Sequence, residues 1–330
     1  MTINERTRAL LGDVDPQSSS GLEIGPLTNP AVTPAMGRIR YLDHTDTDTL
    51  RATHGDHLEV DTDRLVPLDY AQNGRSIIDT IGPETRFDYV VASHVIEHVP
   101  DPILWLRELD AILAPGGVVL LAVPDKRRCF DILRNPSVAA DFIDAHLAGV
   151  TRPTPRQVFD HHQSAMAWNG TIAWLADPPL HELTPVRTAE QALELATDGS
   201  GEYQDVHCWV FTPTSFRRVM TALRRLGLIP FDVERCTETA GHEFFVTLRA
   251  GDRHTADHEP PSVTDRAAGT DAALSRELQA VQALLADAEA DRDAAQSALH
   301  ATLATRSWTI TRPLRELNDL RSRLAARRRR

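Results

Sequence analysis

Short apolar runs alternate with helical patterns between residues 18 and 250. The runs indicate strands because each holds a few apolar or β-branched residues bounded by turn-forming residues. The expected strands cover residues 22–25, 39–43, 65–68, 87–93, 118–123, 229–234 and 243–248. The helical patterns cover residues 48–54, 76–81, 101–113 and 213–226. This alternation predicts an α/β fold whose sheet is mostly parallel, covered on both faces, and finished by an antiparallel edge.

Local signals differ in strength along this region. At residues 101–113, Asp101 is suited to cap the helix and Pro102 occupies its first position. The turn sequence Ala-Pro-Gly-Gly at 114–117 ends that helix before the apolar run at 118–123. The strand expected at 65–68 has the weakest signal because Pro67 cannot donate to a sheet ladder.

The rest of the chain has other patterns. The expected segments are a polar leader (1–17), a domain over 18–250 with a helical insertion at about 127–200, a linker (251–270), a coiled coil (271–306) and a basic tail (307–330). In the insertion, Trp168 and Trp174 are spaced about two helical turns apart and are expected in a helix. The coiled coil is expected because apolar positions there step by four and three residues. A single solvated helix is the alternative.

Charge limits the class of partner. The formal net charge of −12 argues against nucleic-acid binding. Residues 312–330 nevertheless carry eight arginines against Glu316 and Asp319. That tail is expected to contact an anionic membrane surface, with a solubilising end as the alternative. The N-terminus lacks an apolar signal segment and no run is long enough to span a bilayer, so we expect a cytoplasmic protein with peripheral contact at the inner face of the plasma membrane.

Candidate binding residues stand at the ends of the expected strands. Ligands of open parallel sheets bind beyond the carboxyl ends of the strands, where the strand order reverses. Gly25 ends the first strand, Asp43 ends the second, and Ser93 ends the fourth. A carboxylate such as Asp43 can accept hydrogen bonds from ribose hydroxyls.

The run 87–128 brings in a family resemblance. After its strand come Ser93 and His94, then Glu97 and His98, and a Leu-x-Pro-Gly-Gly turn precedes the next strand. This run, with Leu-Glu-Ile-Gly at 22–25 and Tyr-Leu-Asp-His at 41–44, resembles class I S-adenosylmethionine-dependent methyltransferases of the Methyltransferase-11-like type. The segments 159–162, 205–213 and 242–249 resemble methyltransferases encoded among bacterial cell-surface polysaccharide genes.

The resemblance implies a Rossmann-like methyltransferase fold over about 230 residues and S-adenosylmethionine as cofactor. It assigns cofactor contacts to Glu23, Gly25, Pro26, Asp43, His44, Asp69, Ser93 and His94. Among these, Asp43 takes the ribose, Ser93 and His94 the methionine side, Glu23 the methionine amino group, and Asp69 or a neighbour the adenine. One departure is clear, because the usual Gly-x-Gly loop is reduced to Gly25 followed by Pro26, which has no N–H.

Methylation of a sugar hydroxyl requires a base, for which histidine is suited. His98, His94 and His207 are the candidate catalytic residues, with a structural role as the alternative for each. Asp160, His161 and His207 could hold a divalent ion, but their spacing is not diagnostic and we predict no metal. The leading hypothesis is O-methylation of a sugar in a cell-surface glycan or its precursor.

A different class of function competes with the enzyme. A non-catalytic Rossmann-like scaffold could organise glycan-assembly enzymes through its coiled coil, and the glycine-poor first loop favours it. Glycosyltransferases, or a second copy of the chain, are then the expected partners of residues 271–306. A nicotinamide-dependent oxidoreductase is disfavoured, because residues 25–30 contain one glycine where that cofactor needs Gly-x-Gly-x-x-Gly.

Overall fold

The computed structural model describes residues 3–54, 61–175, 177–198 and 203–251. The predicted coiled coil, the basic tail and the linker beyond its first residue lie outside these ranges. Among the described residues, no helix combines the length and apolar character needed to cross a bilayer.

Seven strands form the main sheet, in the spatial order β3-β2-β1-β4-β5-β10-β9. They are β1 (Ser20–Ile24), β2 (Arg38–Asp43), β3 (Tyr70–Ala71), β4 (Phe87–Ser93), β5 (Leu113–Pro124), β9 (Phe231–Cys236) and β10 (Glu243–Ala250). The first five are parallel, whereas β10 runs antiparallel to both β5 and β9. The predicted Rossmann-like sheet with an antiparallel edge is confirmed. Its strand order reverses between β1 and β4, which is where ligands bind in such sheets.

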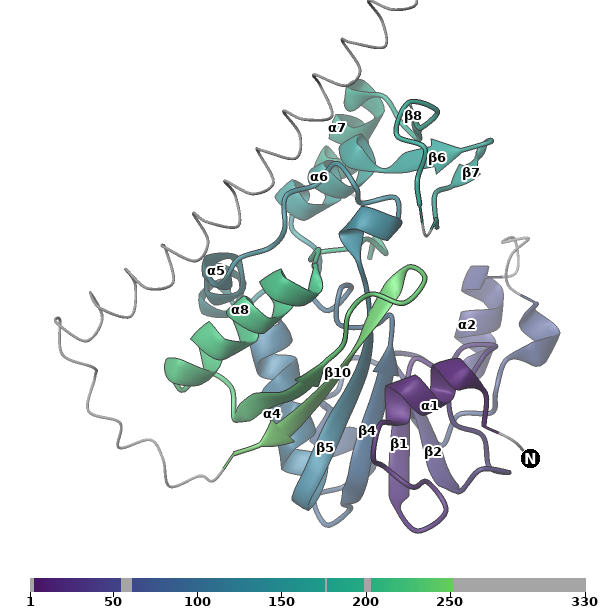
Figure 1. Ribbon diagram of the computed structural model, residues 1–330, viewed down its shortest axis with the longest axis vertical. Helices are drawn as coiled ribbons and strands as arrows, with labels where there is room; N and C mark the ends of the chain where they lie inside the picture. Colours follow the sequence, from purple (N-terminus) through teal and green to yellow (C-terminus); the bar gives the residue numbers. More distant parts are fainter. Residues whose placement is uncertain (1–2, 55–60, 176, 199–202, 252–330) are drawn as a thin grey trace, which may run out of the picture. The chain divides into compact units, whose positions relative to one another are not determined.

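Apolar side chains are buried on both faces of the sheet. Along β4, Tyr89 and Val91 join one core cluster, and Val90 and Ala92 join the other. This alternation follows from the two-residue period of a strand. The helices outside the insertion are α1 (Glu5–Leu11), α2 (Thr47–His54), α3 (Ile77–Ile81), α4 (Pro102–Ile112) and α8 (Pro213–Arg225). Figure 1 shows α1 on the near face of the sheet and α4 on the far face. Asp101 caps α4 by accepting the Leu104 N–H, as predicted.

The N-terminal segment corrects the expectation of a polar leader at 1–17. Residues 5–11 form α1, and Leu10 and Leu11 are buried against Val91, Leu120 and neighbouring residues of the sheet. Only one short side of this seven-residue helix is apolar, so its sequence has too little periodicity to predict it.

The third strand also differs from its predicted position. Residues 65–68 are not a strand, and β3 consists of Tyr70–Ala71, following a 3₁₀ turn at Thr62–Arg64. Pro67 lacks the N–H that a parallel ladder requires, so pairing with β2 begins only after it.

The insertion at 127–200 is only partly helical. Its elements are a 3₁₀ turn (Lys126–Arg128), α5 (Ala139–Ala148), α6 (Pro155–Ser164), α7 (Ala189–Thr197) and a small sheet of β6 (Met166–Trp168), β7 (Thr171–Ile172) and β8 (Thr184–Pro185). The helical expectation for the two tryptophans is therefore wrong, since Trp168 ends β6 and Trp174 follows β7. A tight turn at Asn169 and Gly170, both with positive φ, reverses the chain between these strands.

Candidate active site

The candidate residues at three strand ends lie side by side. The register pairs Ile24 of β1 with Leu42 of β2 and with Ala92 of β4. The residues that follow, Gly25, Asp43 and Ser93, therefore stand at one level across three neighbouring strands. The prediction that these strand ends meet is confirmed, and they meet where the strand order reverses.

The loop after β1 has few backbone donors to offer. The Gly25 N–H is donated to the Leu42 carbonyl, and Pro26 has none. Gly25 has φ of +66°, and a Cβ there would lie 3.1 Å from Val95 Cγ2, so glycine keeps this strand end open. Among the described residues, no helix joins β1 to β2. A ligand at this strand end would therefore meet Gly25 and Pro26 through their Cα and carbonyl atoms, because neither has a free N–H.

The side chain of Glu23 bonds to the protein's own backbone. Its buried carboxylate accepts the backbone N–H groups of Ala31 at 2.7 Å and Val32 at 3.0 Å. Burial raises the pKa of Glu23 to about 7, although these two hydrogen bonds act in the opposite direction. Both oxygens thus help to hold the loop after β1, and the contact of Glu23 with the methionine amino group stays a prediction.

Asp43 is the residue whose position matches its expected role most closely. Its Oδ1 accepts the His44 N–H and contacts His44 Nδ1, both at 2.7 Å. This bond to Asp43 raises the pKa of the exposed His44 ring. Both contacts with His44 use Oδ1 of Asp43, and the carboxylate stands at the end of β2 beside Gly25. A carboxylate in this position is suited to accept hydrogen bonds from adjacent ligand hydroxyls.

Asp69 lies before β3 and not at its carboxyl end. Its oxygens accept from the Arg40 guanidinium at 2.5 Å and from the Tyr41 N–H at 2.9 Å. The Asp69 side chain therefore binds to the flank of β2, and its adenine contact stays a prediction. Gln72 and Asn73 follow β3 instead, and their N–H groups bond to the carbonyls of Asp43 and His44.

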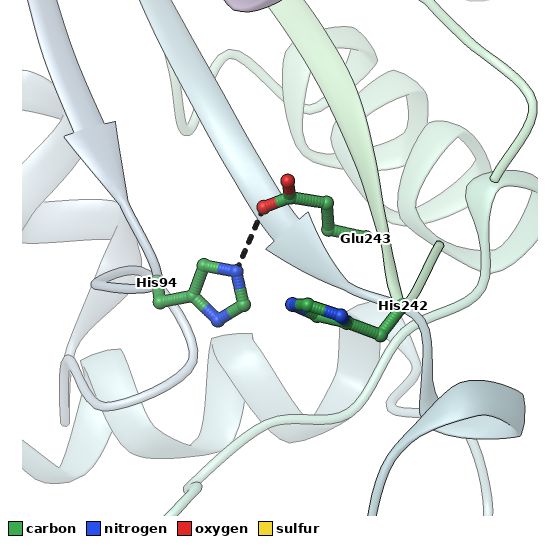
Figure 2. Close-up of side chains that lie close together, drawn as sticks. All are labelled: His94, His242 and Glu243. Atoms are coloured by element: carbon green, nitrogen blue, oxygen red, sulfur yellow. Dashed lines mark hydrogen bonds and ion pairs between the residues drawn. The ribbon is translucent and has the colours of Figure 1, made fainter. Parts of the chain in front are cut away.

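His94 is one end of a chain of polar contacts, of which Figure 2 shows the contact between His94 and Glu243. His94 Nε2 lies 2.9 Å from Glu243 Oε2, and Arg6 donates to both oxygens of Glu243 at 2.7 and 2.8 Å. Arg6 also donates to Ser93 Oγ at 2.7 Å. Burial raises the pKa of Glu243, but the bonds from His94 and Arg6 outweigh it and bring the pKa to about 2. His94 itself has φ of +55°, an unfavourable backbone conformation for this residue that is typical of functional sites.

His98 and His207 meet edge to face, with ring centroids 4.7 Å apart. His98 Nδ1 lies 2.6 Å from Asp205 Oδ1, and His207 Nδ1 lies 2.5 Å from Asp131 Oδ2. Burial lowers the pKa of His98, but the bond to Asp205 and nearby negative charges raise it more, so it ends above its ordinary value. The three candidate catalytic histidines are thus brought to one region, each paired with a carboxylate.

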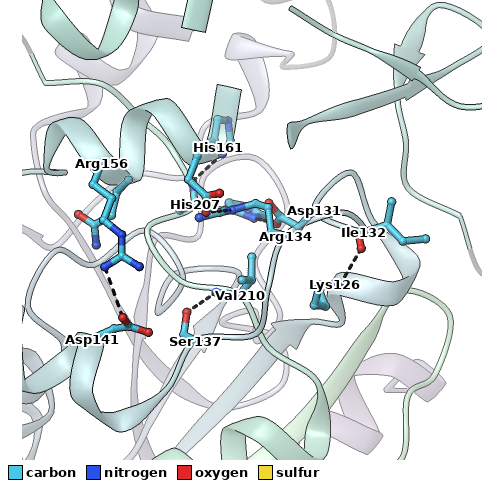
Figure 3. Close-up of polar contacts among 12 residues, drawn as sticks. Lys126, Asp131, Ile132, Arg134, Ser137, Asp141, Arg156, His161, His207 and Val210 are labelled. Carbon is cyan, nitrogen blue, oxygen red and sulfur yellow. Dashed lines mark hydrogen bonds and ion pairs between the residues drawn. The ribbon is translucent and has the colours of Figure 1, made fainter. Parts of the chain in front are cut away.

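Arg134 completes the contacts behind His207 (Figure 3). It donates to Asp131 and to the His207 carbonyl at 2.8 Å each, and its Nε bonds to Asp160 at the same distance. His161 Nδ1 accepts the His207 N–H at 3.1 Å. Asp160 Oδ2 and His161 Nδ1 are used in these bonds, and neither residue belongs to the two groups of close potential metal ligands found among the described residues.

Sequence reasoning missed Arg6, Asp131 and Glu243. Arg6 lies 237 positions from Glu243 along the chain, so no local pattern could join them. Glu243 stands directly before the apolar run of β10, and Asp131 and Arg134 are charged residues that the fold buries. In the sequence, a charged residue next to an apolar run, as at Glu243, was the available sign of such a site.

The row Gly25-Asp43-Ser93 fits the cofactor that the resemblance implies. It places an open glycine at one strand end, a carboxylate for hydroxyls at the next, and the hydroxyl of Ser93 with the ring of His94 at the third. These groups match the mixed apolar, hydroxyl and amino character of S-adenosylmethionine.

Comparison with known proteins identifies the domain. The family model described as "Methyltransferase domain" matches residues 3–223. No curated protein matches. Among solved structures, a Mesorhizobium loti S-adenosylmethionine-dependent methyltransferase is 16% identical (TM-score 0.37), with 74% of this chain and 95% of that chain covered. The glycopeptide N-methyltransferase MtfA with sinefungin is 15% identical (TM-score 0.34; 76% and 95% covered). The CurJ carbon methyltransferase is 11% identical (TM-score 0.36), and the match covers 74% of this chain and about half, 52%, of CurJ.

The family match covers β1 to β5, the strand ends and the histidines described above, and it ends within α8, before β9 and β10. The chain belongs to the methyltransferase-domain family. It is an S-adenosylmethionine-dependent methyltransferase, and S-adenosylmethionine is its cofactor.

Proposed function

We propose that the protein methylates a hydroxyl oxygen of a sugar, in a cell-surface glycan or in its lipid-linked or nucleotide-linked precursor. The observation that carries this proposal is the Arg6–Glu243–His94 chain beside Ser93, at the end of β4. The glycan context is supported by the resemblance of residues 159–162, 205–213 and 242–249 to methyltransferases of polysaccharide genes.

His94 is the base in this proposal. S-adenosylmethionine, when bound, supplies the methyl group on a sulfonium that is already a good leaving group. The protein must hold the acceptor in line and take the hydroxyl proton. Glu243 orients the imidazole through Nε2, and Arg6 keeps Glu243 ionised. His94 Nδ1 lies 3.6 Å from the nearest Glu97 oxygen, beyond hydrogen-bonding distance, so its lone pair can accept the proton.

Trp174 supports a sugar as the acceptor. Its side chain is 37% exposed although the ring packs against His94, with centroids 5.6 Å apart, and against His242 at 5.1 Å. A partly exposed indole presents a large rigid surface, on which the apolar face of a sugar ring can pack. Such packing would bring a sugar hydroxyl next to His94.

The test is methyl transfer by the full chain to a panel of nucleotide-activated hexoses and deoxyhexoses, with simple amines as competing acceptors. We expect an O-methyl sugar, located by NMR, and a kcat lowered about 10²–10⁴-fold by His94→Gln. His181→Gln is the matched control, since that ring is 83% exposed. Methylation of amines alone, or full activity of a folded His94→Gln variant, would overturn the proposal.

A further inference from the structure

Three potential metal ligands meet behind the His94 base. Glu97 and His98 lie in the segment between β4 and α4, and His207 comes from the segment before α8. One donor atom from each residue lies within 4.8 Å of the other two. Backbone bonds fix this meeting, because the Glu97 carbonyl accepts the N–H groups of Cys208 at 2.7 Å and Trp209 at 3.1 Å.

Glu97 is the member of this group that lacks a partner. Its side chain is fully buried, and neither carboxylate oxygen has a hydrogen-bond partner among the described residues. The nearest ring nitrogen, His94 Nδ1, lies 3.6 Å away. An unpaired buried carboxylate is strongly unfavourable unless a cation compensates it, so such groups pair with charges or coordinate metals.

The two histidines are oriented as metal ligands are. His98 uses Nδ1 for Asp205, and His207 uses Nδ1 for Asp131, which Arg134 holds in turn. Figure 3 shows this last chain, Arg134–Asp131–His207. Metal-bound histidines commonly give their second ring nitrogen to a carboxylate, which fixes the tautomer and leaves the other nitrogen for the ion. Here that leaves Nε2 of both rings.

We propose that Glu97, His98 and His207 bind one divalent first-row transition-metal ion. Two imidazole nitrogens and one carboxylate oxygen suit zinc, iron or cobalt, and three protein ligands leave open positions for an exogenous oxygen. Donors of one tetrahedral ion lie about 3.5 Å apart, so binding draws these side chains closer together. Metal binding goes beyond the proposed function and does not depend on it. The binding of the methyl acceptor's oxygen at an open coordination position of the metal does rest on the proposed function.

A second group of possible ligands, His94, His242 and Glu243, is a poorer site (Figure 2). Both oxygens of Glu243 accept from Arg6, and His94 Nε2 bonds to Oε2 as well. The charge and the lone pairs that a metal would need are therefore already used. Glu97 differs because neither of its oxygens has a hydrogen-bond partner among the described residues.

The test measures metal binding to the full chain, prepared with a histidine-free tag and stripped with a chelator. Cobalt(II) is titrated while its visible ligand-field absorption is followed, and zinc(II) is then added as a competitor. We expect one tight site per chain, a cobalt spectrum that zinc abolishes, and a rise in the melting temperature. Glu97→Gln and His207→Ala should each weaken binding at least about 100-fold.

Two matched variants separate this site from the alternatives. His242→Ala removes a ligand of the second group, and His181→Ala removes an exposed histidine. Both should bind cobalt as the wild type does. His98→Asn serves as a further ligand variant if Glu97→Gln or His207→Ala fails to fold. The proposal is overturned if the folded wild type binds neither ion, if folded ligand variants retain its affinity, or if His242→Ala abolishes binding. None of these readouts requires methyl transfer, so the two proposals fail separately.

Discussion

Asp43 ends β2 at the level of Gly25 and Ser93, and its replacement by alanine is expected to weaken cofactor binding without unfolding the protein. The carboxylate is 8% exposed, and its bonds within the protein go to His44, which is itself exposed. Removing it leaves no buried donor unpaired, so the loss of stability should stay within about 1 kcal/mol.

The loss of affinity should be much larger than that. If the carboxylate accepts both ribose hydroxyls, two hydrogen bonds to a charged group are lost, each contributing roughly 1.5–3 kcal/mol. The lower bound, about 3 kcal/mol in total, corresponds to roughly a 150-fold rise in Kd. Asp43→Asn keeps the shape and one acceptor oxygen but removes the charge, and should fall between the wild type and Asp43→Ala.

Calorimetric titration with S-adenosylhomocysteine measures this difference on the full chain. Asp48→Ala is the matched control, because that carboxylate is exposed and pairs with Arg51 on α2. Circular dichroism melts establish that each variant is folded. An affinity within about threefold of wild type in folded Asp43→Ala would refute the assignment of the ribose to this residue.

Three further predictions concern stability, measured as the free energy of unfolding in urea. Leu10→Ala should cost about 2–5 kcal/mol because Leu10 of α1 is fully buried against the sheet, and a loss like that of the exposed-site control Arg8→Ala would contradict a folded α1. Glu23 has a pKa of about 7 in the folded protein against an ordinary 4.5, so between these pH values the native state binds more protons than the unfolded state. The free energy of unfolding should therefore fall by roughly 3 kcal/mol as pH rises from 4.5 to 7. Glu23→Gln should lack this dependence on pH, and an unchanged dependence in the variant would show that Glu23 does not cause it. Glu243 has a pKa of about 2 in the folded protein, so its contribution to the free energy of unfolding is present above pH 4.5 and is lost as pH falls toward 2. In this range Glu243→Gln should show at most a weak dependence of stability on pH. A dependence as steep as that of the wild type would count against this ion-paired carboxylate as its source.

The sequence predicts those parts of the fold that local physics determines. The strand at 87–93 has the predicted bounds, and Asp101 and Pro102 begin α4 as expected, because apolar runs and caps act over a few residues. The sequence also predicts that Gly25, Asp43 and Ser93 lie at the same edge of the sheet, because parallel strands place their carboxyl ends there. Function at that edge could therefore be inferred before the structure was known.

What the sequence could not predict depends on long-range contacts. The Arg6–Glu243–His94 chain joins α1, the start of β10 and the end of β4. Glu97 meets His207 although the two are 110 positions apart along the chain. The two-residue β3 and the small sheet of the insertion are too short to show a period. Glu23 and Asp69 were expected to face a ligand. In the structure, the carboxylate of Glu23 accepts backbone N–H groups, and that of Asp69 accepts a backbone N–H group and the Arg40 guanidinium.

Calorimetric titration of the full-length protein with S-adenosylmethionine, alongside NAD as a control, tests the central claim most directly. We expect stoichiometric binding of S-adenosylmethionine in the micromolar range and no binding of NAD. Absence of S-adenosylmethionine binding by the folded protein would contradict it. The non-catalytic scaffold that acts through residues 271–306 would then become the better explanation.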